Sequence, residues 1–307
     1  MDTAVGFFIF NRLDTTKEVF EQIRIAKPSR LYLISDGPRK TREGEAETVA
    51  EVRGYVESHI DWDCKVTKNY ADSNMGCKKR MASGITWLLQ NEEQAIILED
   101  DCKPTQDFFR FMEEMLDKYK DDERVMMVSG YMLLKHVHIK DSYTFSEFAT
   151  IWGWATWRRA WDHYDIRISD WEQVKKRGEL KRKFTTLGYI KAVKDFDSVY
   201  YNRKDTWDIQ WFYTLVKERG LNIVPAVNMV ENLGFGREDA THTTGETDQD
   251  FTTHPMEFPL RHPETVALDE AYDRAYDREN WGLYVVLKRK IVGLFGKNED
   301  PYPAHLL

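Results

Sequence analysis

Short apolar runs alternate with amphipathic stretches along the first 130 residues of the chain. Brief apolar runs bounded by turn residues are typical of buried strands, whereas apolar residues three and four positions apart are typical of helices. Strands are predicted at 5–10, 30–35, 64–69, 95–98 and 125–129. Helices are predicted between them, at 15–26, 41–59, 75–91 and 104–119. Alternation at this spacing indicates βαβ units and an α/β fold with a mostly parallel sheet flanked by helices.

The regular alternation fades after residue 130, and a smaller, different region is expected there. A loop is predicted at 131–150, followed by charged helical sequence at 170–205. A further helix is predicted at 207–219 and a strand at 221–224. An aperiodic stretch at 231–262 then leads to a last helix at 268–295. The change in pattern divides the chain into three regions, 1–130, 131–250 and 251–307.

Composition narrows the class of protein. No stretch of about 18 apolar residues is present, so no membrane-spanning helix is predicted, and no basic segment typical of a signal peptide precedes the first strand. The three cysteines form no CxxC pair, which favours a reducing, cytoplasmic compartment. The net charge of −8 argues against a nucleic-acid partner.

Three consecutive carboxylates, Glu99, Asp100 and Asp101, follow the apolar strand at 95–98. Ligands of open parallel sheets bind beyond the carboxyl ends of the strands. Adjacent carboxylates at such an edge need neutralisation, and Mg²⁺ or Mn²⁺ held by one or two carboxylates together with substrate phosphates would provide it. The alternative is a solvated acidic turn before the helix that starts near Pro104. Placement at a strand end favours the metal or nucleotide site.

Several motifs follow one another along most of residues 4–245. Three predicted strands are followed by Asn11-Arg12, by Ser35-Asp36-Gly37 and by Glu99-Asp100-Asp101. The later motifs are Trp152-Gly153-Trp154, Trp207-Asp208 with Trp211, Asn232 to Gly236, and Thr241-His242. This ordered set resembles the GT-A nucleotide-sugar transferases, with the closest likeness to the N-acetylglucosaminyltransferase I type.

The resemblance implies a GT-A-like fold in which 1–130 binds a nucleotide-sugar and 131–250 binds the acceptor. It implies metal-dependent, inverting transfer of a hexosyl or N-acetylhexosaminyl group from a UDP-sugar to a hydroxyl of a glycan or lipid-linked saccharide. Mn²⁺ or Mg²⁺ would be the cofactor.

The resemblance also implies roles on the donor side. Asp101 would bind the metal, Glu99 and Asp100 the ribose and sugar, and Asp36 the uracil edge. Arg12 would reach the nucleotide or its phosphates, which suits a guanidinium. The remaining donor-site candidates are Lys79, Arg80, Trp154 and Gly236. A solvated basic helix face is an equal alternative for Lys79 and Arg80.

Asp208 is the candidate catalytic base, because inverting transfer needs one carboxylate to take the proton from the acceptor hydroxyl. The alternative is that Asp208 only stabilises the start of the helix at 207–219. Asp205 and Asp162 are further candidates. Three tryptophans, Trp152, Trp154 and Trp157, could line an acceptor pocket, although their spacing places at least one of them in the core.

Two segments near the C-terminus carry further expectations. The Gly- and Thr-rich stretch 234–245 is typical of a loop over a donor site, and His242 within it is a candidate second metal ligand or phosphate contact, against an ordinary exposed histidine. In 284–295 basic residues lie among apolar ones, which suits either a helix peripheral to the inner face of an anionic membrane or a terminal helix docked on the core.

Other enzyme classes fit less well. The chain has no Walker loop, GxSxG elbow or GxGxxG motif, which disfavours kinases, hydrolases and dehydrogenases. A sugar-1-phosphate nucleotidyltransferase is the nearest alternative, but the Gly-rich basic loop usual in such enzymes is replaced by Asn11-Arg12-Leu13-Asp14. A non-catalytic carbohydrate-binding relative is the third hypothesis.

Overall fold

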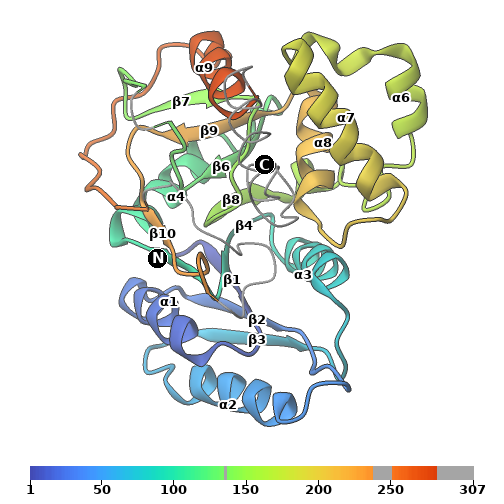
Figure 1. Cartoon of the computed structure of the whole chain (residues 1–307). Coiled ribbons are helices and arrows are strands. Elements are labelled where there is room, and N and C mark those ends of the chain that lie inside the picture. Colours follow the sequence, from blue (N-terminus) through green and yellow to red (C-terminus); the bar gives the residue numbers. More distant parts are fainter. Residues whose placement is uncertain (135–136, 238–250, 282–307) are drawn as a thin grey trace.

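Eight strands form one mixed sheet through the middle of the protein, from β3 at the bottom of Figure 1 to β7 at the top. The structure is a computed structural model, and it describes residues 1–134, 137–237 and 251–281. The strand order is β3-β2-β1-β4-β8-β6-β9-β7. Strands β8 and β7 run antiparallel to their neighbours, and the other pairs are parallel. The predicted fold class, a mostly parallel α/β sheet flanked by helices, is confirmed.

The strands of the large sheet are β1 (Ala4–Ile9), β2 (Arg30–Ser35), β3 (Lys65–Tyr70), β4 (Gln94–Glu99), β6 (Val125–Ser129), β7 (Tyr143–Ser146), β8 (Trp154–Trp157) and β9 (Leu221–Pro225). A small second sheet pairs β5 (Cys102–Pro104) with β10 (Val230–Asn232). The helices are α1 (Leu13–Ala26), α2 (Glu45–Ser58), α3 (Cys77–Asn91), α4 (Gln106–Lys118), α5 (Arg158–Trp161), α6 (Trp171–Arg177), a 3₁₀ turn (Glu179–Arg182), α7 (Thr186–Tyr200), α8 (Asp208–Glu218) and α9 (Glu270–Trp281).

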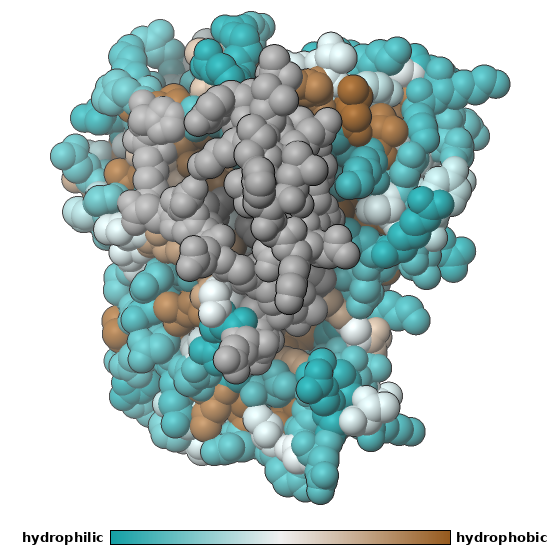
Figure 2. Space-filling model, viewed as in Figure 1, coloured by the Kyte–Doolittle hydropathy of each residue, from teal (hydrophilic) through white to brown (hydrophobic). Residues whose placement is uncertain are grey.

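Helices cover both faces of the sheet and bury its apolar residues. On one face α1, α2 and α4 pack through residues such as Phe20 and Phe108, which are almost fully buried. On the other face α3, α5 and α8 enclose a cluster rich in tryptophan. A third cluster joins α6, α7, α8 and α9. Burial on both faces explains why β1 and β4 are nearly continuous apolar runs. The described residues visible in Figure 2 are mostly hydrophilic, with apolar residues in small groups.

The small sheet joins two segments that lie far apart in the sequence. Strand β5 directly follows the acidic run, and β10 pairs with it antiparallel. The backbone N–H of Leu233 then donates to the carbonyl of Asp101 at 2.7 Å. The segment after β10 is therefore fixed beside the acidic run.

The predicted strands and helices up to residue 130, together with the helix and strand after residue 207, are confirmed within a few residues at their ends. Strand β7 lies in the stretch predicted as a loop, and β8 was not predicted. All four residues of β8, Trp-Ala-Thr-Trp, are buried because the strand lies between β4 and β6. Such a strand has no polar face and shows no alternation. Strands from 1–130 and 131–250 share one sheet, and the proposed division into three regions stays a prediction.

Two predictions fall outside the described residues. His242 and most of the stretch 234–245 belong to 238–250, and the basic and apolar segment belongs to 282–307. Within the described part of the chain, no helix has the length and apolar character needed to cross a membrane.

A hydrogen-bonded chain fixes the segment that leads into α9. The hydroxyls of Tyr119 and Tyr143 are 2.5 Å apart, the Tyr143 hydroxyl is 2.9 Å from Nδ1 of His262, and Nε2 of His262 is 3.5 Å from Glu114. Burial, with the charge of Lys118, lowers the pKa of His262 below 6.5. At a pH between the pKa of His262 in the folded protein and its pKa in the unfolded protein, the unfolded state binds more protons. The free energy of unfolding therefore falls as the pH drops through 6.5.

We therefore expect the melting temperature to fall less in His262→Gln than in the wild type when the pH is lowered from 7.5 to 5.5. The expected difference is about 1–2 °C. Scanning calorimetry measures it, and His163→Gln, at an exposed histidine on the same chain, should behave like the wild type. Equal pH dependence in all three proteins would contradict the interpretation.

Candidate active site

A cavity of about 370 Å³ opens beyond the carboxyl ends of β1, β2 and β4, where the sequence placed the site. The start of α3 and the residues just before α8 form its other walls. Six carboxylates and three arginines line it, namely Asp36, Glu99, Asp100, Asp101, Asp205 and Asp208, with Arg12, Arg39 and Arg80. The cavity is therefore rich in negative charge.

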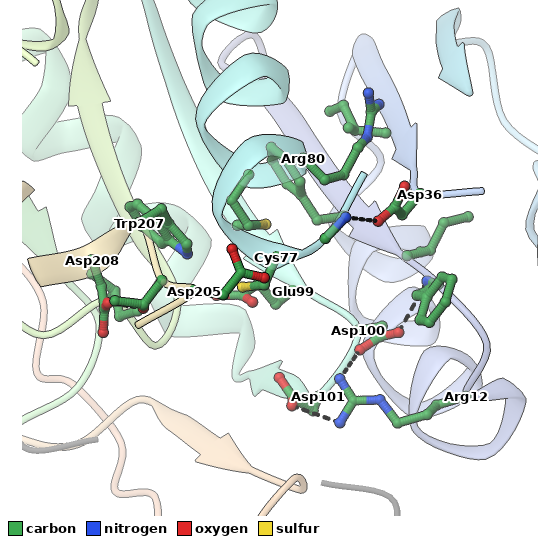
Figure 3. Close-up of a pocket in the computed structure, with 18 of the residues that line it drawn as sticks. Arg12, Asp36, Cys77, Arg80, Glu99, Asp100, Asp101, Asp205, Trp207 and Asp208 are labelled. Atoms are coloured by element: carbon green, nitrogen blue, oxygen red, sulfur yellow. Dashed lines mark hydrogen bonds and ion pairs between the residues drawn. The ribbon is translucent and has the colours of Figure 1, made fainter. Parts of the chain in front are cut away.

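Arg12 lies between the last two carboxylates of the acidic run (Figure 3). Its Nη2 donates to Asp100 at 2.5 Å and its Nη1 to Asp101 at 2.9 Å. The sheet register explains the contact, because β1 and β4 are parallel neighbours and Phe8 pairs with Glu99. Burial alone would lower the pKa of Arg12, but the charges of Asp100 and Asp101 raise it. The guanidinium is thus the counter-ion of the run.

Glu99, at the end of β4, accepts no hydrogen bond from the described residues. Burial, with the charges of Asp101 and Asp100, raises the pKa of Glu99 well above its ordinary value. The thiol of Cys77, at the start of α3, lies beside it and beside Asp205 in Figure 3. Burial and the charges of Glu99 and Asp208 likewise raise the pKa of the Cys77 thiol. The surroundings of Glu99 and Cys77 therefore favour the protonated form of each group, or a bound cation beside them.

Asp36 organises the turn before α3. Its Oδ1 accepts from the N–H groups of Gly37 and Met75, both at 2.8 Å. Its Oδ2 accepts from Nδ2 of Asn74 at 3.0 Å and from the N–H of Gly76 at 3.1 Å. Each oxygen thus already accepts two hydrogen bonds, which fills the usual capacity of a carboxylate. Asp36 lines the cavity as expected, but its carboxylate holds the 74–76 turn and has no acceptor position left for a uracil N–H.

Gly76 occupies a position that only glycine fits well. Its φ of 81° and ψ of 158° lie in a region that is essentially restricted to glycine. A Cβ added there would lie 2.9 Å from Oδ2 of Asp205. Asp205, one of the further candidates for the base, therefore packs directly against the N-terminus of α3.

Asp208 is the first residue of α8 and lines the same cavity. Its Oδ1 accepts from the hydroxyl of Thr206 and from the N–H of Ile209 at 2.9 Å. Its Oδ2 accepts no hydrogen bond from the described residues. One oxygen is fixed and the other is available to a ligand.

The side chains present fit a divalent cation that completes its shell with substrate. Among residues 1–134, 137–237 and 251–281, no group of three His, Cys, Asp or Glu side chains is placed to hold a metal alone. Mg²⁺ and Mn²⁺ need only one or two carboxylates when phosphates and water supply the other oxygens. Asp101 lines the cavity and is 16% exposed, so it can offer that oxygen.

Three predicted donor-site residues lie away from the cavity. Lys79 is exposed on α3 and is not among the lining side chains. Trp154 is fully buried and stacks on Trp207 with ring centroids 5.6 Å apart. Gly236 is exposed, with a φ of 70°. Of the three tryptophans proposed for an acceptor pocket, Trp152 lines the cavity and Trp157 packs under α4, where its Nε1 donates to Leu116.

Arg80 lines the cavity, yet its guanidinium is occupied elsewhere. Nη2 donates to the backbone carbonyl and side-chain oxygen of Asn69 at 2.5 and 3.0 Å. The sequence reasoning did not identify Asn74, Cys77 or Thr206 as lining residues. The position of Cys77 at the start of the helix before the acidic strand is the one signal that could have pointed to it.

No protein-family model matches the chain, and no curated protein matches it. Solved structures match it in part. A mannosyltransferase from Pyrobaculum calidifontis in complex with GDP-Man and Mn²⁺ is 14% identical with a TM-score of 0.35, over 50% of this chain and 44% of that one. Mouse xyloside xylosyltransferase 1 is 10% identical with a TM-score of 0.37, over 71% and 82%.

A third structure is 4-diphosphocytidyl-2C-methyl-D-erythritol synthase from Anaerococcus prevotii, which is 11% identical with a TM-score of 0.34, over 67% and 85%. The chain spans less than half the length of the mannosyltransferase. At these scores the likenesses carry no argument about the activity of this chain, and the case for a function rests on the cavity.

We expect Gly76→Ala to destabilise the protein, because alanine is strained at this φ and ψ and its Cβ meets Asp205. The expected loss is about 1–3 kcal/mol in the free energy of unfolding, measured by urea denaturation. Gly54→Ala is the control. Gly54 lies within α2 with no atom within 4 Å of an added Cβ, so a gain of about 0.5–1 kcal/mol is expected. Wild-type stability in Gly76→Ala would contradict the strain argument.

Proposed function

We propose that this protein is a metal-dependent glycosyltransferase that moves a sugar, as a hexosyl or N-acetylhexosaminyl group, from a UDP-sugar to a hydroxyl of a glycan or lipid-linked acceptor. The observation that carries the proposal is the cavity itself. The acidic run with Arg12 would form its donor wall, and Asp208, whose Oδ2 accepts no hydrogen bond from the described residues, lines the same space.

Charge supports a cation in the donor half. Six carboxylates against three arginines give the lining an excess of negative charge. A nucleoside diphosphate is itself an anion, and it would be repelled from this cavity without a cation. Asp101 would hold Mn²⁺ or Mg²⁺, which when bound supplies a counter-charge for the leaving diphosphate.

The residues of the chain supply the other functions. Arg12 uses two of its N–H groups for Asp100 and Asp101, and its remaining N–H groups can bind a phosphate. Oδ2 of Asp208 takes the proton of the acceptor hydroxyl while the hydroxyl oxygen attacks the anomeric carbon of the sugar. The bond from the anomeric carbon to the diphosphate breaks at the same time. A single attack from the face opposite the leaving group inverts the anomeric centre.

The saturation of Asp36 bears on the nucleotide. Because its oxygens are engaged by the 74–76 turn, UDP recognition in this proposal depends on the shape of the turn that Asp36 holds rather than on its carboxylate. A panel of UDP-, GDP- and CDP-sugars therefore belongs in the first experiment.

We expect the purified protein to release nucleoside diphosphate from one of these donors in the presence of Mn²⁺, and to lose that activity in EDTA. Asp101→Asn should lower the rate at least 100-fold and weaken Mn²⁺ binding in the presence of UDP, measured by calorimetry. Asp117→Asn, at an exposed carboxylate on α4, is the control. Full activity in Asp101→Asn would overturn the metal assignment. Pyrophosphate release from UTP and a sugar-1-phosphate would identify a nucleotidyltransferase, and no turnover of either kind would indicate a non-catalytic relative.

Asp208→Asn should lower the transfer rate about 10²–10⁴-fold, the range typical of losing a general base, while nucleotide binding stays unchanged. Rapid-quench or continuous assays of diphosphate release measure the rate, and NMR of the product reports the anomeric configuration. A near-full rate in Asp208→Asn would exclude this base and direct attention to Asp205. A product with retained configuration would exclude the single-displacement mechanism.

A further inference from the structure

The two residues before Asp208, Thr206 and Trp207, are held by contacts with their surroundings. The carbonyl of Thr206 accepts from Nε2 of Gln210 at 2.8 Å. The carbonyl of Trp207 accepts from the hydroxyl of Tyr164 at 3.2 Å. The ring of Trp207 stacks on the buried ring of Trp154 at 5.6 Å. The backbone that carries Asp208 is therefore fixed from both the polar and the aromatic side.

Thr206 lies one residue before Trp207, which is the N-cap of α8. Thr105 and Thr185 are themselves the N-caps of α4 and α7, and their hydroxyls accept from the N–H groups of Phe108 and Gly188. Helix α8 has no side-chain cap hydrogen bond. The hydroxyl of Thr206 instead donates to Oδ1 of Asp208.

The consequence is a carboxylate with two unequal oxygens. Oδ1 accepts from Thr206 and from the N–H of Ile209 at 2.9 Å, whereas Oδ2 accepts from none of the described residues. A carboxylate at the surface of a cavity otherwise rotates about two side-chain bonds. A general base must hold one oxygen within about 2.6–3.2 Å of the proton it takes. Thr206 is 5% exposed and lines the same cavity, so it has little freedom to move away.

We propose that Thr206 is a positioning residue for the base: its hydroxyl fixes Oδ1 of Asp208 so that Oδ2 faces the acceptor hydroxyl. The proposal rests on the proposed function of Asp208 and adds a second residue to it. Thr206 gives up no proton in the reaction and acts through Asp208.

Thr206→Val, which keeps the shape and removes the hydroxyl, tests the proposal. We expect kcat to fall about 10- to 100-fold, the size of one hydrogen bond to a charged group, with the donor KM unchanged. Thr206→Ser, which restores the hydroxyl, should recover most of the rate. Thr214→Val is the control, because Thr214 is a buried threonine of α8 whose hydroxyl bonds to the backbone of Gln210, and its rate should change less than about two-fold.

A double variant separates positioning from general damage. If Thr206 acts through Asp208, Thr206→Val should cause no further loss in the Asp208→Asn background. Losses that multiply in the double variant, or a Thr206→Ser variant as slow as Thr206→Val, would overturn the proposal. Wild-type kcat in Thr206→Val with an inactive Asp208→Asn would overturn the Thr206 proposal alone. A fully active Asp208→Asn would overturn the base and Thr206 together.

Discussion

The guanidinium of Arg12, which pairs with both Asp100 and Asp101, is the constraint on which the acidic half of the cavity depends. Three consecutive carboxylates at the end of a central strand repel one another, and burial makes their charged forms still less favourable. Arg12 compensates two of them at 2.5 and 2.9 Å. It can do so because β1 and β4 are parallel neighbours whose ends coincide. The register between β1 and β4 therefore determines how the charges of the acidic run are balanced.

The other half of the cavity depends on aromatic packing. Strand β8 inserts antiparallel between β4 and β6 and places Trp154 in the core, where Trp161, Trp207 and Trp211 pack around it. This cluster fixes the start of α8 and with it Asp208. These tryptophans therefore lie in the core beneath the cavity, where they support the backbone that carries Asp208.

The sequence predicted much of this arrangement and could not have predicted the rest. Apolar runs located the strands, and the rule that ligands bind beyond parallel strand ends predicted that Arg12, Asp36 and Asp101 lie close together. Asp208, at the start of a helix, was a candidate through the family resemblance, and it lines the same cavity. The partners of each side chain were beyond reach. Asp36 is saturated by a turn some 40 residues later, and only the path of that turn reveals it. Strand β8 was not predicted because it is buried on both faces, and its sequence Trp-Ala-Thr-Trp shows no alternation of exposed polar and buried apolar residues. Trp154 was placed with the donor for the same reason.

The pairing of β10 with β5 has a consequence for how the protein acquires its site. The carbonyl of Asp101 receives the N–H of Leu233, a residue that follows it by more than 130 positions. Contacts of such long sequence separation are slow to form, because the intervening loop must close first. A nascent chain can assemble β1 to β4 early, with the acidic run already in place at their edge. The wall beside Asp101 can form only after the region beyond residue 230 has been synthesised, so this part of the cavity is completed late in synthesis.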